Sequence, residues 1–215
     1  MGPMDVFSNS LQFIGAFVAF SIAFVAYKGV RETSSSSMLR LAAAFVFLGT
    51  GFVLQGLYGI GSIGSAPGFE FSVATLLLAG MFLQTAGYFF LAFSHVVDVM
   101  LSGKRGLATA LVLFPIFALS QTSIETVLRS LSFYFILYGV IETTLAYSKN
   151  KNPNTLMIAA GLGMLAAGWW VSLVAPDVAL LNLLQLLMKE VGLLALFVPV
   201  LKFSFRKPGD LHAPV

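Results

Sequence analysis

Long apolar runs, broken by short turns that carry most of the charge, constrain this chain more than any other feature of its sequence. A helix needs about 20 mainly apolar residues to cross the hydrocarbon core of a bilayer. Stretches such as residues 41–48 do not alternate apolar with polar positions, so they do not fit the strands of a membrane barrel. The sequence therefore predicts an all-α bundle of seven transmembrane helices, at residues 9–29, 39–61, 71–97, 106–123, 127–148, 155–175 and 178–203.

The composition agrees with an integral membrane protein. Hydrophobic residues make up 58% of the chain and charged residues 10%, and the mean hydropathy is +0.93. A soluble domain carries about 25% charged residues. No loop between the predicted spans is long enough to fold by itself. We therefore expect one domain over residues 1–215, a multi-pass protein of the cell membrane whose first partner is the lipid bilayer.

The distribution of basic residues predicts the orientation of the bundle. The turns on one side hold nearly all of the 12 basic residues, namely Lys28, Arg31, Arg40, Lys104, Arg105, Lys149, Lys151, Lys202, Arg206 and Lys207. The turns on the other side hold Glu70, Glu125 and Asp177, with Arg129 nearby. Cytoplasmic loops carry an excess of Lys and Arg, which predicts an outside N-terminus and a cytoplasmic C-terminus. This bias also explains the net charge of +3 without a nucleic-acid partner.

The order of the predicted spans allows a parallel duplication, with repeats at residues 9–97 and 127–203 and a linker helix at 106–123. Two alignments carry the hypothesis, and because apolar helices share residue types easily, chance similarity is its alternative. The first places Leu41 over Ile158, and the second places Phe82 over Leu187. They pair Ala42 with Ala159, Ala43 with Ala160, Leu48 with Leu165, Gly51 with Gly168, Gln84 with Lys189 and Gly87 with Gly192.

This layout of seven spans resembles that of the SWEET sugar transporters, the trimeric intracellular cation channels and the microbial rhodopsins. The resemblance is one of architecture and carries over no site residue. SWEET proteins have prolines in the paired helices of both repeats, whereas residues 9–29 and 39–61 contain none. The triple glycine followed by Arg-Asp of the cation channels is also missing.

Polar side chains on the last predicted span form the first part of a candidate site. Asn182, Gln185, Lys189 and Gly192 follow one another at helical spacing and therefore share one face. Lys189 lies too far from either end of its span to bring its ammonium group easily to water. Glu190 points about 100° away from Lys189 and needs different surroundings. Charges at this depth are costly, so either a pathway or a helix-locking contact must explain them.

Two other predicted spans carry polar residues on one face. Tyr134, Tyr138 and Glu142 recur every four residues in the span 127–148, and Gln84 and Tyr88 do so in the span 71–97. At about 1.5 Å of rise per residue, Gln84 and Tyr134 lie at a depth similar to that of Lys189. We expect these residues to meet near the bilayer midplane, with Glu142 closer to the cytoplasm. The remaining spans look poorer in polar stripes.

Small and aromatic residues of the span 155–175 suggest packing roles. Ala159, Gly163 and Ala167 recur every four residues, a pattern that allows close helix contact. Trp169 and Trp170 lie toward the end of this span that is predicted to face outward. We expect them to act as packing residues or as anchors at the membrane interface.

The sequence offers little for catalysis or for a cofactor. It contains no cysteine, and its two histidines are His95 and His212. A bis-histidine haem or a histidine-rich metal site is therefore not expected. The HExxH and G-x-S-x-G motifs are missing, and the carboxylates are scattered. We expect no cofactor and no enzymatic activity.

These observations favour a small transporter or channel that moves a small polar solute or ion past Lys189. Gln84 and the tyrosines would line the route, and Glu142 would act as an inner gate. One alternative is a seven-helix receptor or sensor, including one that attaches retinal to Lys189, although the span 71–97 lacks an acidic counter-ion. Another is a structural subunit whose polar faces meet a partner membrane protein or a second copy of the chain.

Overall fold

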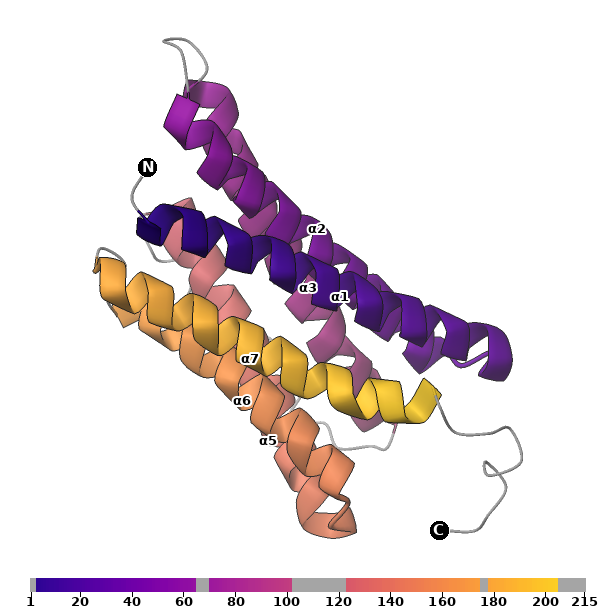
Figure 1. The fold of residues 1–215 in the computed structure, drawn as a ribbon. Helices are drawn as coiled ribbons and strands as arrows, with labels where there is room; N and C mark the ends of the chain where they lie inside the picture. Colours follow the sequence, from indigo (N-terminus) through magenta and orange to yellow (C-terminus); the bar gives the residue numbers. More distant parts are fainter. Residues whose placement is uncertain (1–2, 65–69, 102–122, 175–177, 205–215) are drawn as a thin grey trace.

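The computed structural model describes residues 3–64, 70–101, 123–174 and 178–204, which form helices and no strand (Figure 1). Each of the six helices is long and apolar enough to cross a membrane, which indicates a multi-pass membrane protein. They are α1 (Pro3–Thr33), α2 (Ser36–Gly64), α3 (Glu70–Leu101), α5 (Ile124–Asn150), α6 (Pro153–Val174) and α7 (Ala179–Ser204). The predicted span 106–123 lies, apart from Ser123, outside the described residues.

Two tight turns join helices into antiparallel pairs. Between α1 and α2, Ser34 adopts a left-handed backbone with φ of 52°, and its N–H donates to the carbonyl of Val30 at 2.8 Å. Between α5 and α6, Lys151 has φ of 50°, and its N–H donates to the carbonyl of Tyr147 at 2.8 Å. Each bond satisfies a carbonyl at the end of a helix and reverses the chain within a few residues.

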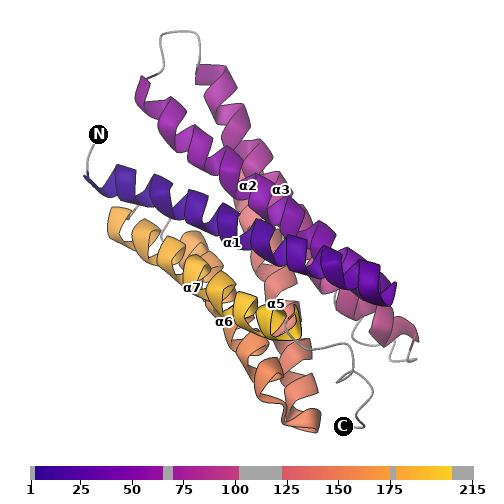
Figure 2. The same cartoon turned by 45° about the vertical axis from the view of Figure 1, so that its right-hand side comes forward.

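The helices form a closed ring of contacts. Among the described residues, contacts run in the order α1, α2, α3, α5, α6, α7 and back to α1, so each helix packs against two others. Helices α1, α3, α5 and α7 begin at one end of the bundle, here called the N-terminal end, and α2 and α6 run in reverse (Figures 1 and 2). The ring thus consists of two units of three helices, α1–α3 and α5–α7, which meet along the seams α1–α7 and α3–α5.

Apolar side chains fill the middle of the ring. The core includes Phe45, Leu48 and Phe52 of α2 and Leu162 and Leu165 of α6, all of which are buried. Large apolar residues also cover the outside of the bundle, where Phe17 is 73% exposed, Phe24 71% and Phe82 62%. An apolar exterior of this kind fits lipid rather than water.

Hydroxyl groups connect the two units along the seam between α3 and α5. Thr85 Oγ1 and Ser132 Oγ lie 2.8 Å apart within hydrogen-bond distance, and both residues are buried. Thr85 Oγ1 also donates to the carbonyl of Met81, one turn earlier in its own helix, at 2.9 Å. The pair fixes the register of α3 against α5 without a buried charge.

Glycines bring α2 and α3 into close contact. A Cβ atom added at Gly51 would lie 2.6 Å from Gln84 Cγ and 2.7 Å from the carbonyl oxygen of Gly80. A Cβ atom added at Gly87 would lie 2.7 Å from Leu48 Cγ. These separations are shorter than carbon and oxygen atoms tolerate, so both positions need glycine for the two backbones to approach.

The pair α6 and α7 is built in the same way. A Cβ atom at Gly168 would lie 2.9 Å from the carbonyl oxygen of Gln185 and 3.0 Å from Lys189 Cγ. A Cβ atom at Gly192 would lie 2.9 Å from Leu165 Cγ. Glycine again lets one helix pack directly against the other.

The expected close-contact stripe of α6 was assigned to the wrong face. A Cβ atom at Gly163 would meet no atom within 4 Å, and Ala167 is only half-buried. Gly161 takes part in the close contact instead, because a Cβ atom there would lie 2.8 Å from the carbonyl oxygen of Gly192. Small residues recur on more than one face of this helix, so their spacing alone does not identify the contact face.

Candidate functional site: a polar pocket at the N-terminal end

A partly open cavity of about 220 Å³ lies toward the N-terminal end, and all six described helices contribute to its lining. Its volume is below the ~300–1,000 Å³ of pockets for drug-sized ligands, so it suits a small metabolite or ion. Most of its lining side chains are polar. They are Ser8, Asn9, Gln12, Gln55, Tyr58, Arg129, Ser172, Asn182, Gln185 and Lys189.

Lys189 lies at the inner side of this pocket against the face of an indole ring. Its Nζ is 3.5 Å from the centroid of the Trp169 ring, and the two side chains belong to α7 and α6. Lys189 is 5% exposed and Trp169 2%. A desolvated cation over tryptophan gains about 2 kcal/mol or more. The absence of a side chain at Gly168 lets the stem of Lys189 pass close to α6 and reach this position.

Arg129 supplies a second positive charge from α5. One of its terminal nitrogens donates to both the carbonyl and the hydroxyl oxygen of Ser172 on α6, at 2.9 Å each. The other terminal nitrogen pairs with the Glu125 carboxylate one turn earlier. Arg129 is therefore held in a fixed position at the edge of the pocket. These contacts give Arg129 a structural reason to lie near turns whose other charged residues are acidic.

Amide side chains complete the lining. Gln185 Nε2 donates to Asn182 Oδ1 at 3.1 Å along one face of α7. The carbonyl oxygens of Gln185 and of Gln12 on α1 are buried and accept no hydrogen bond within the described part of the chain. Buried polar atoms in native structures nearly always have a partner, so water or a solute is the natural partner for both.

Two basic side chains, Lys189 and Arg129, contribute to the lining, and no acidic side chain does so among the described residues. The charge of Arg129 is balanced by Glu125, which lies outside the lining. The carboxylate of Glu190, next in sequence to Lys189, is directed toward α1, where an added Cβ at Gly15 would overlap it. No ion pair joins Lys189 to Glu190 in the described part of the chain. The pocket therefore has a positive charge that a bound anion would balance.

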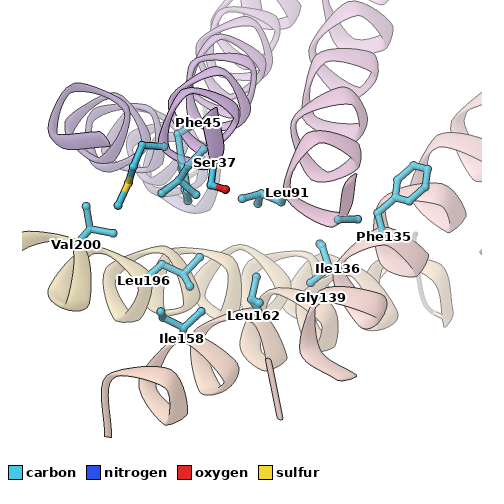
Figure 3. Close-up of a pocket in the computed structure, with 13 residues that line it drawn as sticks. Ser37, Phe45, Leu91, Phe135, Ile136, Gly139, Ile158, Leu162, Leu196 and Val200 are labelled. Carbon is cyan, nitrogen blue, oxygen red and sulfur yellow. The ribbon is translucent and has the colours of Figure 1, made fainter. Parts of the chain in front are cut away.

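The apolar core separates this pocket from the other end of the bundle. Tyr88 of α3 lies edge-on to Trp169, with ring centroids 6.0 Å apart, and is fully buried. Beyond it, toward the end where α7 finishes, lies a cavity of about 270 Å³ between the two units (Figure 3). Phe45, Leu91, Leu162 and Leu196 point toward this space, with Ser37 at its border (Figure 3). The protein thus has a polar cavity at one end and an apolar one toward the other.

The structure brings together part of the predicted site. Asn182, Gln185 and Lys189 line the polar pocket on one face of α7. Tyr88 does not line it but contacts Trp169, whose ring supports Lys189. Their roles in a solute pathway stay a prediction.

Gln84 and Glu190 lie outside the pocket lining. Gln84 is fully buried against Gly51, and both atoms of its amide group lack a hydrogen-bond partner among the described residues. Glu190 is 4% exposed and faces α1. Thr50 of α2, one possible partner for Glu190 by its depth in the sequence, donates its hydroxyl to the carbonyl of Val46 in its own helix at 2.9 Å. These two buried groups are positioned between helices rather than toward the cavity.

The polar face of α5 also lies away from the pocket. Tyr138 is buried, while Tyr134 and Glu142 are half-buried, and none of the three lines the polar cavity. That Tyr134 meets Lys189 stays a prediction. The gating role of Glu142 stays a prediction.

Several pocket residues were not among the predicted site residues. Asn9 and Gln12 are three residues apart on α1, and Gln55 and Tyr58 are three apart on α2, although these helices seemed poor in polar stripes. Both pairs lie in the part of their helix nearest the N-terminal end of the bundle. Two short polar stripes at the same end of the bundle were the sequence signal that could have identified them. Trp169 was expected to be a packing or interface residue, and its contact with Lys189 has no sequence signature.

Within the described residues, no group of three or more His, Cys, Asp and Glu side chains lies close enough to hold a metal ion. No family model matches the chain, and no curated protein or solved structure shows significant similarity to it.

Proposed function

We propose that this chain is a small membrane transporter that binds a small polar solute in the pocket at its N-terminal end. The observation that carries this proposal is the buried Lys189 ammonium group on a polar cavity that ends at an apolar core. A charge at this depth is expensive, and such charges mark solute or ion pathways in membrane proteins. Relative movement of the two three-helix units would open the apolar side and release the solute there.

The proposal includes a seventh transmembrane helix. Helix α3 ends at the end of the bundle opposite to the one where α5 begins (Figure 1). In the proposal, residues 106–123 connect these two ends. Residues 106–123 are apolar enough to do so as a helix, which supports the arrangement of three, one and three spans.

It also includes the parallel repeat. The two sequence alignments pair Gly51 with Gly168 and Gln84 with Lys189. The structure has equivalent contacts in the two units, because Gly51 packs against Gln84 and Gly168 packs against Lys189. Gly87 contacts Leu48 just as Gly192 contacts Leu165. The alignment of the second helices, extended toward their starts, also pairs Ser34 with Lys151, the two non-glycine residues with a positive φ. These equivalences support the proposed duplication. In the repeat, Gln84 then takes the place of Lys189.

The orientation follows from the charges. At the end opposite to the pocket, the described residues place Lys28 and Arg31 beside the α1–α2 turn and Lys149 and Lys151 beside the α5–α6 turn. By the positive-inside rule this end is cytoplasmic, so the pocket with Lys189 faces outward.

The natural absence of cysteine gives a direct test, because any introduced cysteine is the only thiol. Asn182→Cys would report on the polar pocket, and Ser37→Cys on the cavity toward the other end. In oriented proteoliposomes, a membrane-impermeant thiol reagent should modify Asn182→Cys only from the outer side. Ser37→Cys should react only from the inner side.

Addition of a transported solute should then change the two labelling rates in opposite directions, since alternating access exposes one site as it closes the other. Acetate, lactate, succinate, glycine and glucose form a first panel. A solute that binds and changes only the Asn182→Cys rate, without uptake into sealed vesicles, would point to a receptor. Labelling of both cysteines from the same side would contradict the proposed transport geometry.

A further inference from the structure

We propose that the polar pocket selects a small organic anion and that Lys189 and Arg129 are its charge partners. This inference deepens the proposed function and depends on it for its biological meaning, but its test requires no transport. The two cations come from α7 and α5, which belong to the same three-helix unit, and both line a cavity of about 220 Å³. Glu125 balances Arg129 from outside the lining, and the described residues of the lining include no carboxylate that would balance Lys189.

The two cations differ in their freedom to accept a ligand. Arg129 donates to Ser172 and is ion-paired with Glu125, so its charge is largely balanced and its position is fixed. The Lys189 ammonium group touches the face of Trp169, an interaction that holds it in place without neutralising its charge. Lys189 is therefore the direct contact for a carboxylate or a similar anionic group.

The neutral part of the lining indicates what else the ligand carries. The carbonyl oxygens of Gln12 and Gln185 are buried acceptors without a donor among the described residues. A ligand that pairs with them must present hydroxyl or N–H groups in addition to its negative charge. A small hydroxy acid fits this chemistry, whereas a simple halide would satisfy Lys189 alone.

The two tryptophans of the chain provide a matched optical probe. Trp169 lies in the pocket, while Trp170 is 55% exposed on the outer surface and packs beside Phe133, with ring centroids 5.5 Å apart. In a Trp170→Phe protein, all tryptophan emission reports on the ring that supports Lys189. Iodide, caesium and acrylamide then serve as anionic, cationic and neutral quenchers of the purified full chain in detergent.

We expect iodide to quench Trp169 more strongly than caesium does. Lys189→Met should lower the iodide quenching constant by roughly tenfold, because one charge at contact distance is worth at least that factor in a partly desolvated site. Acrylamide quenching should stay unchanged, which shows that access to the pocket is preserved. Lys189→Arg should retain the preference for iodide, and Lys202→Met, on the same helix at the other end, should behave like the parent protein.

Competition then identifies the ligand class. Lactate and glycolate should protect Trp169 from iodide. Their neutral amides, lactamide and glycolamide, should not. Equal quenching by iodide and caesium, or equal protection by the acids and their amides, would overturn the anion assignment. If the pocket prefers anions but sealed vesicles take up none of them, the anion site stands and the transport proposal fails. Failure of the anion site and failure of transport therefore give different results.

Discussion

The ammonium nitrogen of Lys189 lies 3.5 Å from the centroid of the Trp169 ring and has no carboxylate partner among the described residues. An ion pair would have locked α7 to a neighbour and cancelled the charge. The aromatic face positions the charge and leaves it available. The proposed ligand-binding role of Lys189 depends on this relationship.

Substitution of Lys189 by methionine is expected to leave the empty protein as stable as before or to stabilise it. Methionine keeps the length of the side chain and removes a buried charge whose desolvation costs several kcal/mol. The lost contact with Trp169 is worth only about 2 kcal/mol. Thermal unfolding in detergent without added solute measures the balance, with Lys202→Met as the control on the same helix. A markedly lower Tm for Lys189→Met alone would favour a helix-locking role.

Gly192→Ala is expected to destabilise the protein by about 1–3 kcal/mol, because the new methyl group would overlap Leu165 and the backbone of Gly161. Gly163→Ala is the matched control on α6, since its added Cβ meets no atom within 4 Å. It should be neutral or stabilising by up to about 1 kcal/mol through helix propensity. Thermal unfolding of both variants in the same detergent provides the comparison. Equal Tm values would contradict the close packing of α6 on α7.

Arg129→Met is expected to destabilise the protein by about 1–3 kcal/mol, because it removes two hydrogen bonds to Ser172 and leaves the Glu125 carboxylate without its partner. Arg129→Lys should lose less, since it retains the charge but not the forked geometry. Glu125→Gln is the control for the ion pair within α5. The measurement is again the unfolding midpoint, and an unchanged midpoint for Arg129→Met would show that its contacts with α6 contribute little.

Glu190→Gln is expected to stabilise the protein by about 1–3 kcal/mol, because it removes a buried carboxylate that has no hydrogen-bond partner among the described residues. Glu142→Gln, at a half-buried position on α5, should change stability by less than about 0.5 kcal/mol. A loss of stability in Glu190→Gln would indicate that the carboxylate has a partner that it needs.

The sequence predicted the helices well because hydrophobicity over about 20 residues is a strong signal. The span predicted at 127–148, for example, corresponds to α5 at Ile124–Asn150, and that predicted at 39–61 corresponds to α2 at Ser36–Gly64. The helices extend a few residues beyond the apolar segments because polar residues at the ends continue the same backbone hydrogen bonding. Hydropathy does not register this extension.

The candidate site was predicted only in part. Lys189 stands out in the sequence because a charge within a span is costly, and Asn182 and Gln185 follow from its helix face. The sequence does not say which other helices share a cavity with that face. Gln12, Arg129 and Trp169 are therefore visible as pocket residues only once α1, α5 and α6 are placed around α7. Gln84 was predicted at the depth of Lys189, but its side chain packs against Gly51 of α2 and does not line the cavity.

The two seams of the ring have a consequence for folding and assembly. Each three-helix unit is built from neighbours in sequence, so it can form from local contacts during synthesis, and ring closure needs only the seams α1–α7 and α3–α5. A unit expressed alone would leave both of its seam faces without a partner. If the two units are repeats, as proposed above, a second copy related by a two-fold axis would offer matching faces in the same parallel orientation. Half of this chain is therefore expected to behave as a dimer, with a closed ring made from two identical polypeptides.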